Sequence, residues 1–202
     1  MTELADKYIA FEGIEGAGKS TVAREVARHL NDSGRDAIFV REPGGTEVGE
    51  RVREILLGEG EAPAPLAEAA LFAASRAQLI HTVVRPALEA GKWVITDRSA
   101  YSSLAYQAIG RDLGLEDVRR LNDIAIGGLW PGRVVLLKLT TGDGLARQAV
   151  DDRIGGEGTR FHESVADGFD SLAAAEPDRF VVVDASRPIS VVVNDVIERL
   201  GL

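Results

Sequence analysis

The sequence contains no cysteine and only three histidines among its 202 residues. Without cysteine, disulfide bonds, thiol catalysis and thiolate zinc sites are all excluded. The histidines, His29, His81 and His162, lie far apart along the chain, so a histidine-rich metal site is not expected. No apolar run reaches the roughly 20 residues of a membrane-spanning helix, and the start MTELADKYIAFEG has no basic segment typical of a signal peptide. These absences predict a cytoplasmic protein.

Positive charge is also scarce, because 32 Asp and Glu outnumber 23 Lys and Arg and leave a formal net charge of -9. Such a surface repels phosphate backbones and anionic lipids, so neither nucleic acid nor a membrane surface is an expected partner. Hydrophobic residues make up 45% and charged residues 27% of the chain, which is ordinary for a globular protein. Disorder and a fibrous structure are therefore not expected, and the chain is long enough to bury a full core.

Short apolar segments alternate with longer helical patterns along the whole chain. The apolar segments predict strands over residues 8–11, 37–40, 93–96, 134–139 and 180–183. The helical patterns cover residues 20–30, 48–57, 66–88, 102–109, 116–126, 161–175 and 189–200, with a possible kink near Pro86. Continuous apolar strands separated by helices indicate a parallel sheet covered on both faces. We therefore predict an α/β fold with a doubly wound, about five-stranded parallel sheet flanked by helices.

Neither a linker nor an internal repeat divides the chain, so residues 1–202 are predicted to form a single domain. Residues 151–160, with the sequence DDRIGGEGTR, differ in texture because they are polar and rich in glycine and charge. This segment is too weakly patterned for a core and is interpreted as part of a lid over about residues 143–160. A disordered surface loop is the alternative.

Residues 13–20, GIEGAGKS, fit the pattern G-x-x-x-x-G-K-[ST] directly between a predicted strand and a predicted helix. Glycines let successive backbone N–H groups converge on phosphate oxygens, and the helix N-terminus and Lys19 add positive charge. The Ser20 hydroxyl is placed to bind Mg²⁺. The predicted ATP- and phosphate-binding residues are Gly13, Ile14, Glu15, Gly16, Ala17, Gly18, Lys19, Ser20 and Thr21. The alternative is a chance match on a glycine-rich turn.

The rest of the chain narrows the class of nucleotide-binding protein. No N-K-x-D motif for guanine is present, and large ATPase machines need far more sequence than this. A small P-loop protein with a Gly-, Asp- and Arg-rich lid is typical of nucleotide and nucleoside kinases.

A second polar group follows the predicted strand over residues 93–96, where Asp97 and Arg98 come at its carboxyl end. Ligands bind at that edge of open α/β sheets. An aspartate there can act on Mg²⁺ or its waters, and an arginine can clamp a phosphate with two hydrogen bonds. A purely structural Asp–Arg pair is the alternative.

Two helical faces offer groups for a base. Phe72 and Arg76 are four residues apart, so both project from one face, and the pair can stack on a base and bond to its edge. Ser103, Tyr106 and Gln107 likewise share a face and offer hydroxyl and amide groups. Taken alone, the first pair is better explained by a core phenylalanine beside a surface arginine.

Six segments resemble bacterial thymidylate kinases in order and spacing, over nearly the whole chain. They are FEGIEGAGKST from Phe11, REPGGTEVGERVR from Arg41, LFAASRAQ from Leu71, DRSAYSSLAYQ from Asp97, LNDIAIGGLWP from Leu121 and RFHESVADGF from Arg160. The resemblance implies a P-loop NTPase fold with a short lid and an ATP- and Mg²⁺-dependent kinase that converts dTMP to dTDP for dTTP synthesis. It also implies a homodimer.

The resemblance assigns the base and sugar contacts of dTMP. Phe72 would stack on thymine, Arg76 would bond to its O4, and Tyr106 would lie beneath the deoxyribose and disfavour a 2′-hydroxyl. Glu15 would contact the 3′-hydroxyl of the sugar. The full set implied for dTMP is Glu15, Glu42, Pro43, Arg53, Phe72, Arg76, Arg98, Ser102, Ser103, Tyr106 and Gln107. Within it, Arg53 and Arg98 match residues on the dTMP phosphate, and Pro43 matches a proline that follows a cis peptide bond.

The resemblance also implies a cation on the migrating phosphoryl group. Some family members carry an arginine within the P-loop, whereas this chain has Gly16 there and would supply Arg153 from the lid, with Arg147 and Arg160 as alternates. The catalytic residues implied are Lys19, Arg98, Arg153, Asp97 and Glu15, and the Mg²⁺ ligands are Ser20 and Asp97, partly through water. Ser99 departs from the aromatic residue or histidine usual after Asp-Arg.

Two other functions stay open at this point. The same fold acting on another acceptor, such as dUMP, is one. A catalytically silent nucleotide sensor is the other, although Lys19, Ser20, Asp97 and Arg98 together argue against it.

Overall fold

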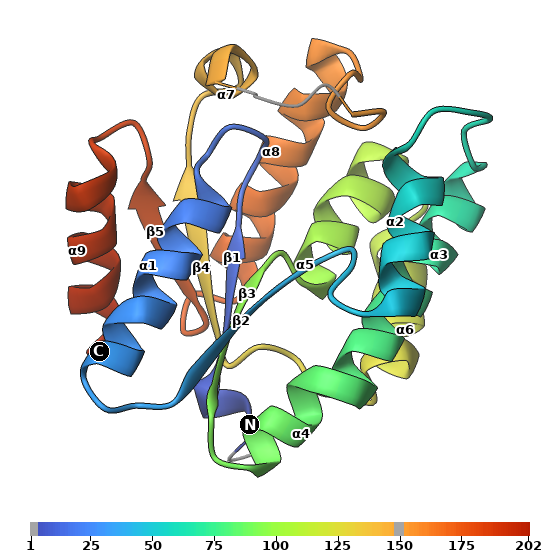
Figure 1. Ribbon diagram of the computed structural model, residues 1–202. Coiled ribbons are helices and arrows are strands. Elements are labelled where there is room, and N and C mark those ends of the chain that lie inside the picture. The colour runs from blue at the N-terminus through green and yellow to red at the C-terminus, as the bar shows by residue number, and fades with distance from the viewer. Residues whose placement is uncertain (1–3, 148–151) are drawn as a thin grey trace.

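A parallel sheet of five strands lies at the centre of the computed structural model, which describes residues 4–147 and 152–202 (Figure 1). The strands are β1 (Tyr8–Glu12), β2 (Ala37–Arg41), β3 (Trp93–Asp97), β4 (Arg133–Lys138) and β5 (Phe180–Asp184). Their spatial order is β2-β3-β1-β4-β5, and every neighbouring pair is parallel. The predicted fold class is thereby confirmed.

The strand sequences follow from their places in the sheet. Central β1 is buried along its whole length, and its residues pair with β3 on one side and β4 on the other, as in the pairing of Phe11 with Asp97 and Val135. Strand β5 lies at the edge of the sheet, and its Val182 side chain is exposed. A strand covered on both faces needs apolar residues at successive positions, which is why β1 and β4 show no alternation.

Helices cover both faces of the sheet (Figure 1). Helix α1 (Lys19–Asp32) packs on β1, β2 and β3 and contacts α9 (Ile189–Leu200), which lies against β5. The opposite face carries α4 (Arg85–Glu89), α5 (Ala100–Ser103) and α8 (Thr159–Ala175). In α1, Val22, Val26 and Leu30 recur at the helical period and are fully buried, so this stripe anchors the helix that leaves the P-loop.

Three further helices form a group beside the sheet (Figure 1). They are α2 (Glu47–Leu57), α3 (Pro65–Leu79) and α6 (Leu115–Ile126), and α3 contacts the other two. The Thr46 hydroxyl caps α2 by accepting a hydrogen bond of 2.9 Å from the Gly49 N–H. A short 3-10 turn, η1 (Ala5–Lys7), precedes β1.

The helical predictions over residues 66–88 and 102–109 were wrong in one respect, because each region contains a wide π-helical turn. The segment expected as one helix consists of α3, the π turn η2 (Ile80–Val84) and α4. Pro86 has no N–H and its ring excludes the carbonyl four residues before it, so a regular ladder cannot continue through this point. Likewise α5 ends at Ser103, and the π turn η3 (Leu104–Gly110) follows.

The segment expected as a lid contains regular structure and one core residue, while its role as a lid stays a prediction. Residues 141–147 form a helix, α7 (Thr141–Arg147), that the sequence did not suggest, and α8 begins at Thr159. Ile154 is only 5% exposed and belongs to the main apolar core, which corrects the expectation that this segment contributes nothing to the core. The expected lid includes residues 148–151, which lie outside the described residues. The single-domain organisation stays a prediction.

None of the helices within residues 4–147 and 152–202 has the length and the apolar content that crossing a membrane requires.

Candidate active site

A cavity of about 460 Å³ opens at the carboxyl ends of the central strands. Its wall joins the P-loop, the loop after β2, helix α3, the start of η3 and the lid. Every residue predicted for dTMP lines it: Glu15, Glu42, Pro43, Arg53, Phe72, Arg76, Arg98, Ser102, Ser103, Tyr106 and Gln107. Segments far apart in sequence therefore meet around one space, as the family resemblance implied.

Only some of the P-loop residues predicted to bind ATP and phosphate line the cavity. Glu15, Gly16, Gly18, Lys19, Ser20 and Thr21 line the cavity. Ile14 and Ala17 instead bury their side chains in the main core and hold the loop against the sheet. Lys19 donates a hydrogen bond of 2.7 Å to the Ile14 carbonyl, and burial lowers the pKa of Lys19 to about 8. A phosphate group in the cavity would oppose this lowering of the pKa and favour the charged form of the lysine.

Gly16 has a φ of 74°, and a Cβ at this position would lie 2.1 Å from the Gly144 carbonyl oxygen in α7. A side chain cannot occupy that space without displacing the backbone of α7. The close approach explains why this chain has no arginine within its P-loop. Any further cation for the phosphates has to come from another element of the cavity wall.

Ser20 and Asp97 lie together, because the Ser20 hydroxyl donates a hydrogen bond to the Asp97 carboxylate. Two adjacent oxygen ligands beside a phosphate cradle suit Mg²⁺, which completes its six-fold shell with phosphate oxygens and water. A cluster of three or more acidic or histidine ligands does not occur within the described residues. The two residues thus fit a magnesium ion that arrives with the nucleotide, and not an all-protein metal site.

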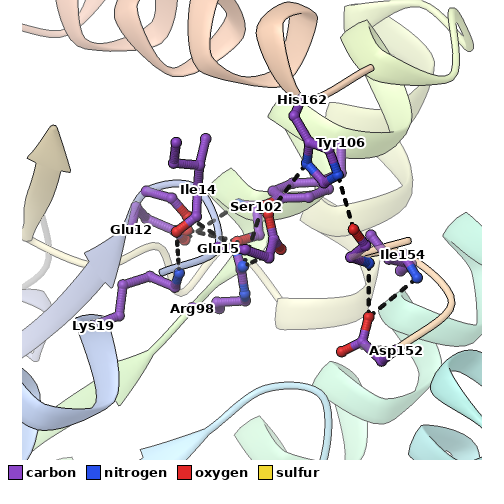
Figure 2. Close-up of polar contacts among 12 residues, drawn as sticks. Glu12, Ile14, Glu15, Lys19, Arg98, Ser102, Tyr106, Asp152, Ile154 and His162 are labelled. Carbon is purple, nitrogen blue, oxygen red and sulfur yellow. Dashed lines mark hydrogen bonds and ion pairs between the residues drawn. The ribbon is translucent and has the colours of Figure 1, made fainter. Parts of the chain in front are cut away.

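Glu15, Arg98 and Tyr106 form a hydrogen-bonded group at the floor of the cavity (Figure 2). Arg98 donates to Glu15 at 2.7 Å and to the Tyr106 hydroxyl at 3.2 Å, and its guanidinium also lies 4.9 Å from the Tyr106 ring centroid. Burial by itself would raise the pKa of Glu15, but Arg98, together with His162, lowers it well below its usual range. Glu15 is therefore a carboxylate that can accept a hydrogen bond from a ligand.

Glu12 is a functional candidate that the sequence interpretation missed. It is fully buried at the end of β1 and accepts hydrogen bonds from the Ser99 hydroxyl at 2.7 Å and the Ser102 hydroxyl at 2.6 Å. Burial raises its pKa, while Arg98 and these hydroxyls oppose the shift. Arg98 itself has a φ of 71°, a strained conformation for a non-glycine residue that the surrounding bonds hold in place. An acid ending an apolar strand was the available signal.

Arg76 occupies the opposite end of the cavity and is only 2% exposed. Its Nε donates to Glu42 at 2.5 Å, Nη1 donates to Ser103 at 3.0 Å and to Asn122, and Nη2 donates to the Ser99 carbonyl at 3.0 Å. A guanidinium has five N–H donors, and the contacts among residues 4–147 and 152–202 leave one N–H of Nη2 for a ligand in the cavity. This arrangement suits an exocyclic carbonyl of a base.

The partner of Arg76, Glu42, is also buried, and no residue that the structure describes forms a hydrogen bond with its Oε1. Burial raises the pKa of Glu42 to about 7, although Arg76 opposes that shift. The peptide bond between Glu42 and Pro43 is cis, as the resemblance predicted. Arg53 approaches from α2 and donates a hydrogen bond of 3.0 Å to the Pro43 carbonyl, so its charge lies beside the same turn.

Phe72 and Gln107 line the same end of the cavity as Arg76, which we call the acceptor end. The Phe72 side chain is partly buried and faces the cavity from α3. Gln107 donates a hydrogen bond of 3.0 Å to Glu68, which is 1% exposed, so the amide has a fixed orientation in the wall. The sequence interpretation did not identify Glu68, because the residues around it do not distinguish it from an acidic residue on the exposed face of a helix.

The three arginines proposed for the lid lie in different surroundings. Arg153 does not line the cavity: its guanidinium donates to the Leu56 carbonyl at 2.9 and 2.6 Å and pairs with Glu68 at 3.3 Å. Arg147 lines the cavity and donates to the Ala185 carbonyl at 3.0 Å, whereas Arg160 is exposed. In this structure the lid-side arginine facing the cavity is therefore Arg147.

The sheet order, the P-loop between β1 and α1, and the cavity with a second polar end define a small P-loop phosphotransferase. Comparison with known proteins gives the particular family. A family model described as thymidylate kinase matches residues 11–196. The chain is 47% identical over 184 residues to a thymidylate kinase of Deinococcus radiodurans, covering 90% of this chain and 89% of that protein. It is 42% identical over 185 residues to one of Caldanaerobacter subterraneus subsp. tengcongensis, covering 91% and 89%.

A solved structure agrees with these sequence matches. The crystal structure of thymidylate kinase from Ehrlichia chaffeensis superimposes with a TM-score of 0.81 and 29% sequence identity, covering 96% of this chain and 97% of that one. The chain belongs to the thymidylate kinase family.

Proposed function

We propose that this protein transfers the γ-phosphoryl group of ATP to dTMP, giving dTDP and ADP. One observation carries the proposal: a single cavity runs from the P-loop residues Lys19 and Ser20 to the buried guanidinium of Arg76 with its spare N–H. A donor triphosphate at one end and a base at the other would bring two phosphates together between them. Membership of the thymidylate kinase family supports the choice of acceptor.

At the acceptor end, Phe72 offers a ring for stacking and Arg76 a fixed donor for the thymine O4. Ser103 and Gln107 stand at the base edge, and the Tyr106 ring fills the space below the sugar. Tyr106 is 4% exposed and tied to Glu15 through its hydroxyl, so it cannot withdraw to admit a 2′-hydroxyl. This is a steric reason for preferring deoxyribonucleotides.

Arg98 and Arg53, with the support of Ser102, hold the acceptor phosphate. An oxygen of that phosphate attacks the γ-phosphorus of ATP, and the bond between this phosphorus and the bridging oxygen of ADP breaks. The attacking oxygen is already ionised near neutral pH, so no strong general base is required. Lys19 stabilises the charge on the transferred group, and Mg²⁺ brought by ATP and held by Ser20 and Asp97 would neutralise the phosphates.

An arginine from the lid completes the charge around the transferred group in this proposal. Arg153 has that role by resemblance, and reaching the phosphates requires it to leave Leu56 and Glu68. Arg147 is the alternate that already faces the cavity.

The test is an ADP-release assay with ATP, Mg²⁺ and, in turn, dTMP, dUMP, dCMP, dGMP, dAMP and UMP. Turnover with dTMP far above the other five acceptors is expected. Turnover mainly with another acceptor would keep the kinase and reject the assigned base contacts. Binding of ATP without turnover of any acceptor would instead support a nucleotide sensor.

We also propose that the protein is a cytoplasmic homodimer. Helices α2, α3 and α6 lie side by side and carry five exposed large apolar side chains: Val48, Ile55, Leu66, Leu115 and Ile124. A second copy of the chain would cover these side chains. Light scattering after gel filtration should give twice the chain mass, and Ile124→Glu, at a residue 76% exposed, should shift the protein to a monomer.

A further inference from the structure

The Glu15 carboxylate is held by three side chains, one of which lies outside the cavity wall. Its Oε1 accepts from Arg98 at 2.7 Å, and both of its oxygens lie within 2.8 Å of the Tyr106 hydroxyl. Its Oε2 also lies 3.5 Å from Nδ1 of His162. Arg98 and Tyr106 are part of the proposed acceptor site, whereas His162 has no assigned role. Figure 2 shows the imidazole between Glu15 and the lid.

His162 is 1% exposed in the first turn of α8. Its Nε2 lies 3.3 Å from the carbonyl oxygen of Gly155, so both ring nitrogens face acceptors. A neutral imidazole has only one N–H, so its other nitrogen would face an acceptor oxygen without a hydrogen between them. An imidazolium has an N–H on each nitrogen and can donate to both oxygens. The bond to Glu15 and the carbonyls of Gly155 and Glu157 raise the pKa of His162, and burial opposes them.

The Gly155 carbonyl belongs to a turn that forms part of the cavity wall. Asp152 accepts hydrogen bonds from the N–H groups of Ile154 at 3.1 Å and Gly155 at 2.8 Å, which fixes residues 152–155 as one piece. Asp152 and Ile154 both line the cavity. One imidazole therefore connects the acid of the P-loop to the lid turn on the other side of the cavity.

We infer that His162 is a positioning residue that orients Glu15 toward the sugar 3′-hydroxyl of the acceptor and ties the lid turn to the P-loop. The inference rests on the proposed function, in which Glu15 accepts a hydrogen bond from that hydroxyl. His162 does not touch the nucleotide itself. Its loss should therefore appear as a loss of discrimination at the 3′ position and not as a uniform loss of activity.

Two substitutions separate the two contacts of the imidazole. His162→Asn places an amide nitrogen near the position of Nδ1, so it keeps a donor for Glu15 and loses the reach to Gly155. His162→Gln places its amide near the position of Nε2, so it keeps a donor for Gly155 and leaves Glu15 without one. The substrates are dTMP and 3′-deoxythymidine monophosphate, the analogue that lacks the 3′-hydroxyl.

The measured quantity is the ratio of kcat/KM for dTMP to kcat/KM for the 3′-deoxy analogue. We expect His162→Gln to lower kcat/KM for dTMP by about tenfold and to change the value for the analogue little, because a bond to a charged group is lost. His162→Asn should retain the ratio to within about threefold while lowering kcat for both substrates. His81→Gln, at an exposed residue of η2, should match the wild type.

An equal loss on both substrates with His162→Gln would overturn the inference, as would an unchanged ratio. A wild-type enzyme without dTMP turnover would instead reject the proposed function, and turnover without any preference for the 3′-hydroxyl would reject the role of Glu15. Both would overturn the inference as well.

A double-mutant cycle with Glu15→Gln gives a second route if one single variant folds poorly. Once Glu15→Gln has removed the carboxylate, His162→Asn and His162→Gln should have equal ratios. A ratio that still separates the two variants in the Glu15→Gln protein would contradict positioning through Glu15. Thermal melting of each protein shows which of them are folded.

Discussion

Two loops face each other across the cavity, and they are held in different ways. The P-loop, residues 13–18, is a backbone structure between the central strand β1 and the buried helix α1. Its glycines at 13, 16 and 18 have positive φ, and the side chains of Ile14 and Ala17 pack into the core. Its geometry therefore follows from the sheet, the core and the glycines.

The lid segment, residues 152–158, is held mainly by side chains. Arg153 binds the Leu56 carbonyl and Glu68, Glu157 pairs with Arg111 at 2.6 Å, and His162 holds the Gly155 carbonyl. Among the described residues, the backbone hydrogen bonds of this segment stay within it or reach only the start of α8. Each anchor can be broken without disturbing the sheet, whereas the P-loop cannot move alone.

This contrast suits a phosphotransferase. A rigid cradle fixes the donor phosphates before reaction, since positioning supplies most of the catalysis of phosphoryl transfer. In the lid prediction, a segment held by side-chain contacts can change its position more readily than the P-loop, although the buried Ile154 would have to leave the core. Substitutions in the P-loop should therefore abolish chemistry, and substitutions in the lid should reduce it stepwise.

The largest effect should come from Lys19→Met, which keeps the length of the side chain and removes its charge. We expect kcat/KM to fall by about 10³-fold, because a preorganised cation in a buried site stabilises transferring charge strongly. Steady-state ADP release measures it. Lys138→Met, on an exposed lysine paired with Asp170, is the matched control and should stay near wild type. A loss of only a few-fold at Lys19 would break the contrast between cradle and lid.

The next effect concerns stability at the fixed end of the cavity. Arg76→Ala leaves the buried Glu42 without its cation and with unmade hydrogen bonds, and removing one partner of a buried pair costs about 3 kcal/mol or more. Urea unfolding measures this change. Arg28→Ala breaks two exposed pairs on α1 and should change the free energy of unfolding far less than Arg76→Ala. Equal losses at both positions would show that the acceptor end is not more rigidly built than the surface.

On the lid, Arg153→Ala should lower kcat by about tenfold and change KM for dTMP by less than about threefold. The physical reason is the loss of a cation at the transferred group without loss of an acceptor contact. Parallel kinetics on the two alternates, Arg147→Ala and Arg160→Ala, sharpen the comparison, and the exposed Arg160 should show the smallest loss of kcat. A larger kcat loss at Arg147 than at Arg153 would move the role to Arg147, and an unchanged kcat at Arg153 would reject its assignment.

The smallest effect is a pH dependence at the link between the two loops. His162 lies beside Glu15 of the P-loop, and Glu15 in turn binds the Tyr106 hydroxyl and Arg98. On the lid side, Glu157 is the nearby acid, and its side chain pairs with Arg111. Because the pKa of His162 is raised from its ordinary value of 6.5, its contribution is complete below 6.5 and disappears as pH rises through the folded pKa.

The preference for dTMP over its 3′-deoxy analogue should therefore fall by about threefold between pH 6 and pH 9 in the wild type. His162→Asn, which carries no proton to lose, should show a flat ratio over the same range. A ratio that declines equally in both proteins would assign the titration to another group.

Much of the molecule could be predicted from local pattern. The strands are apolar at successive positions because they are buried on both faces, and their predicted positions agree with the structure to within one residue at each end. The P-loop was evident because backbone geometry that needs glycine at fixed spacing leaves a direct trace in the sequence. The residues expected around dTMP line one cavity, although their individual roles stay predictions.

Other features left no such trace. The π turns η2 and η3 follow a helical pattern in the sequence, since a wide turn changes the register by one residue and not the composition. Glu68 and His162 belong to the cavity's supporting contacts, and nothing local separates a buried acid or histidine on a helix from a surface one. Glu12, another supporting contact, left only the weak signal of an acid at the end of an apolar strand.

The sequence by itself determined the order of strands and helices, the phosphate cradle and the family, because these depend on periodicity, glycine placement and motif spacing along the chain. Only the tertiary structure decided which charges are paired: Arg76 with Glu42, Arg153 with Glu68, and His162 between Glu15 and Gly155. Such pairs join residues separated by up to about 150 positions. Their energies depend on distance and burial, which exist only once the sheet has brought the carboxyl ends of its strands to one edge.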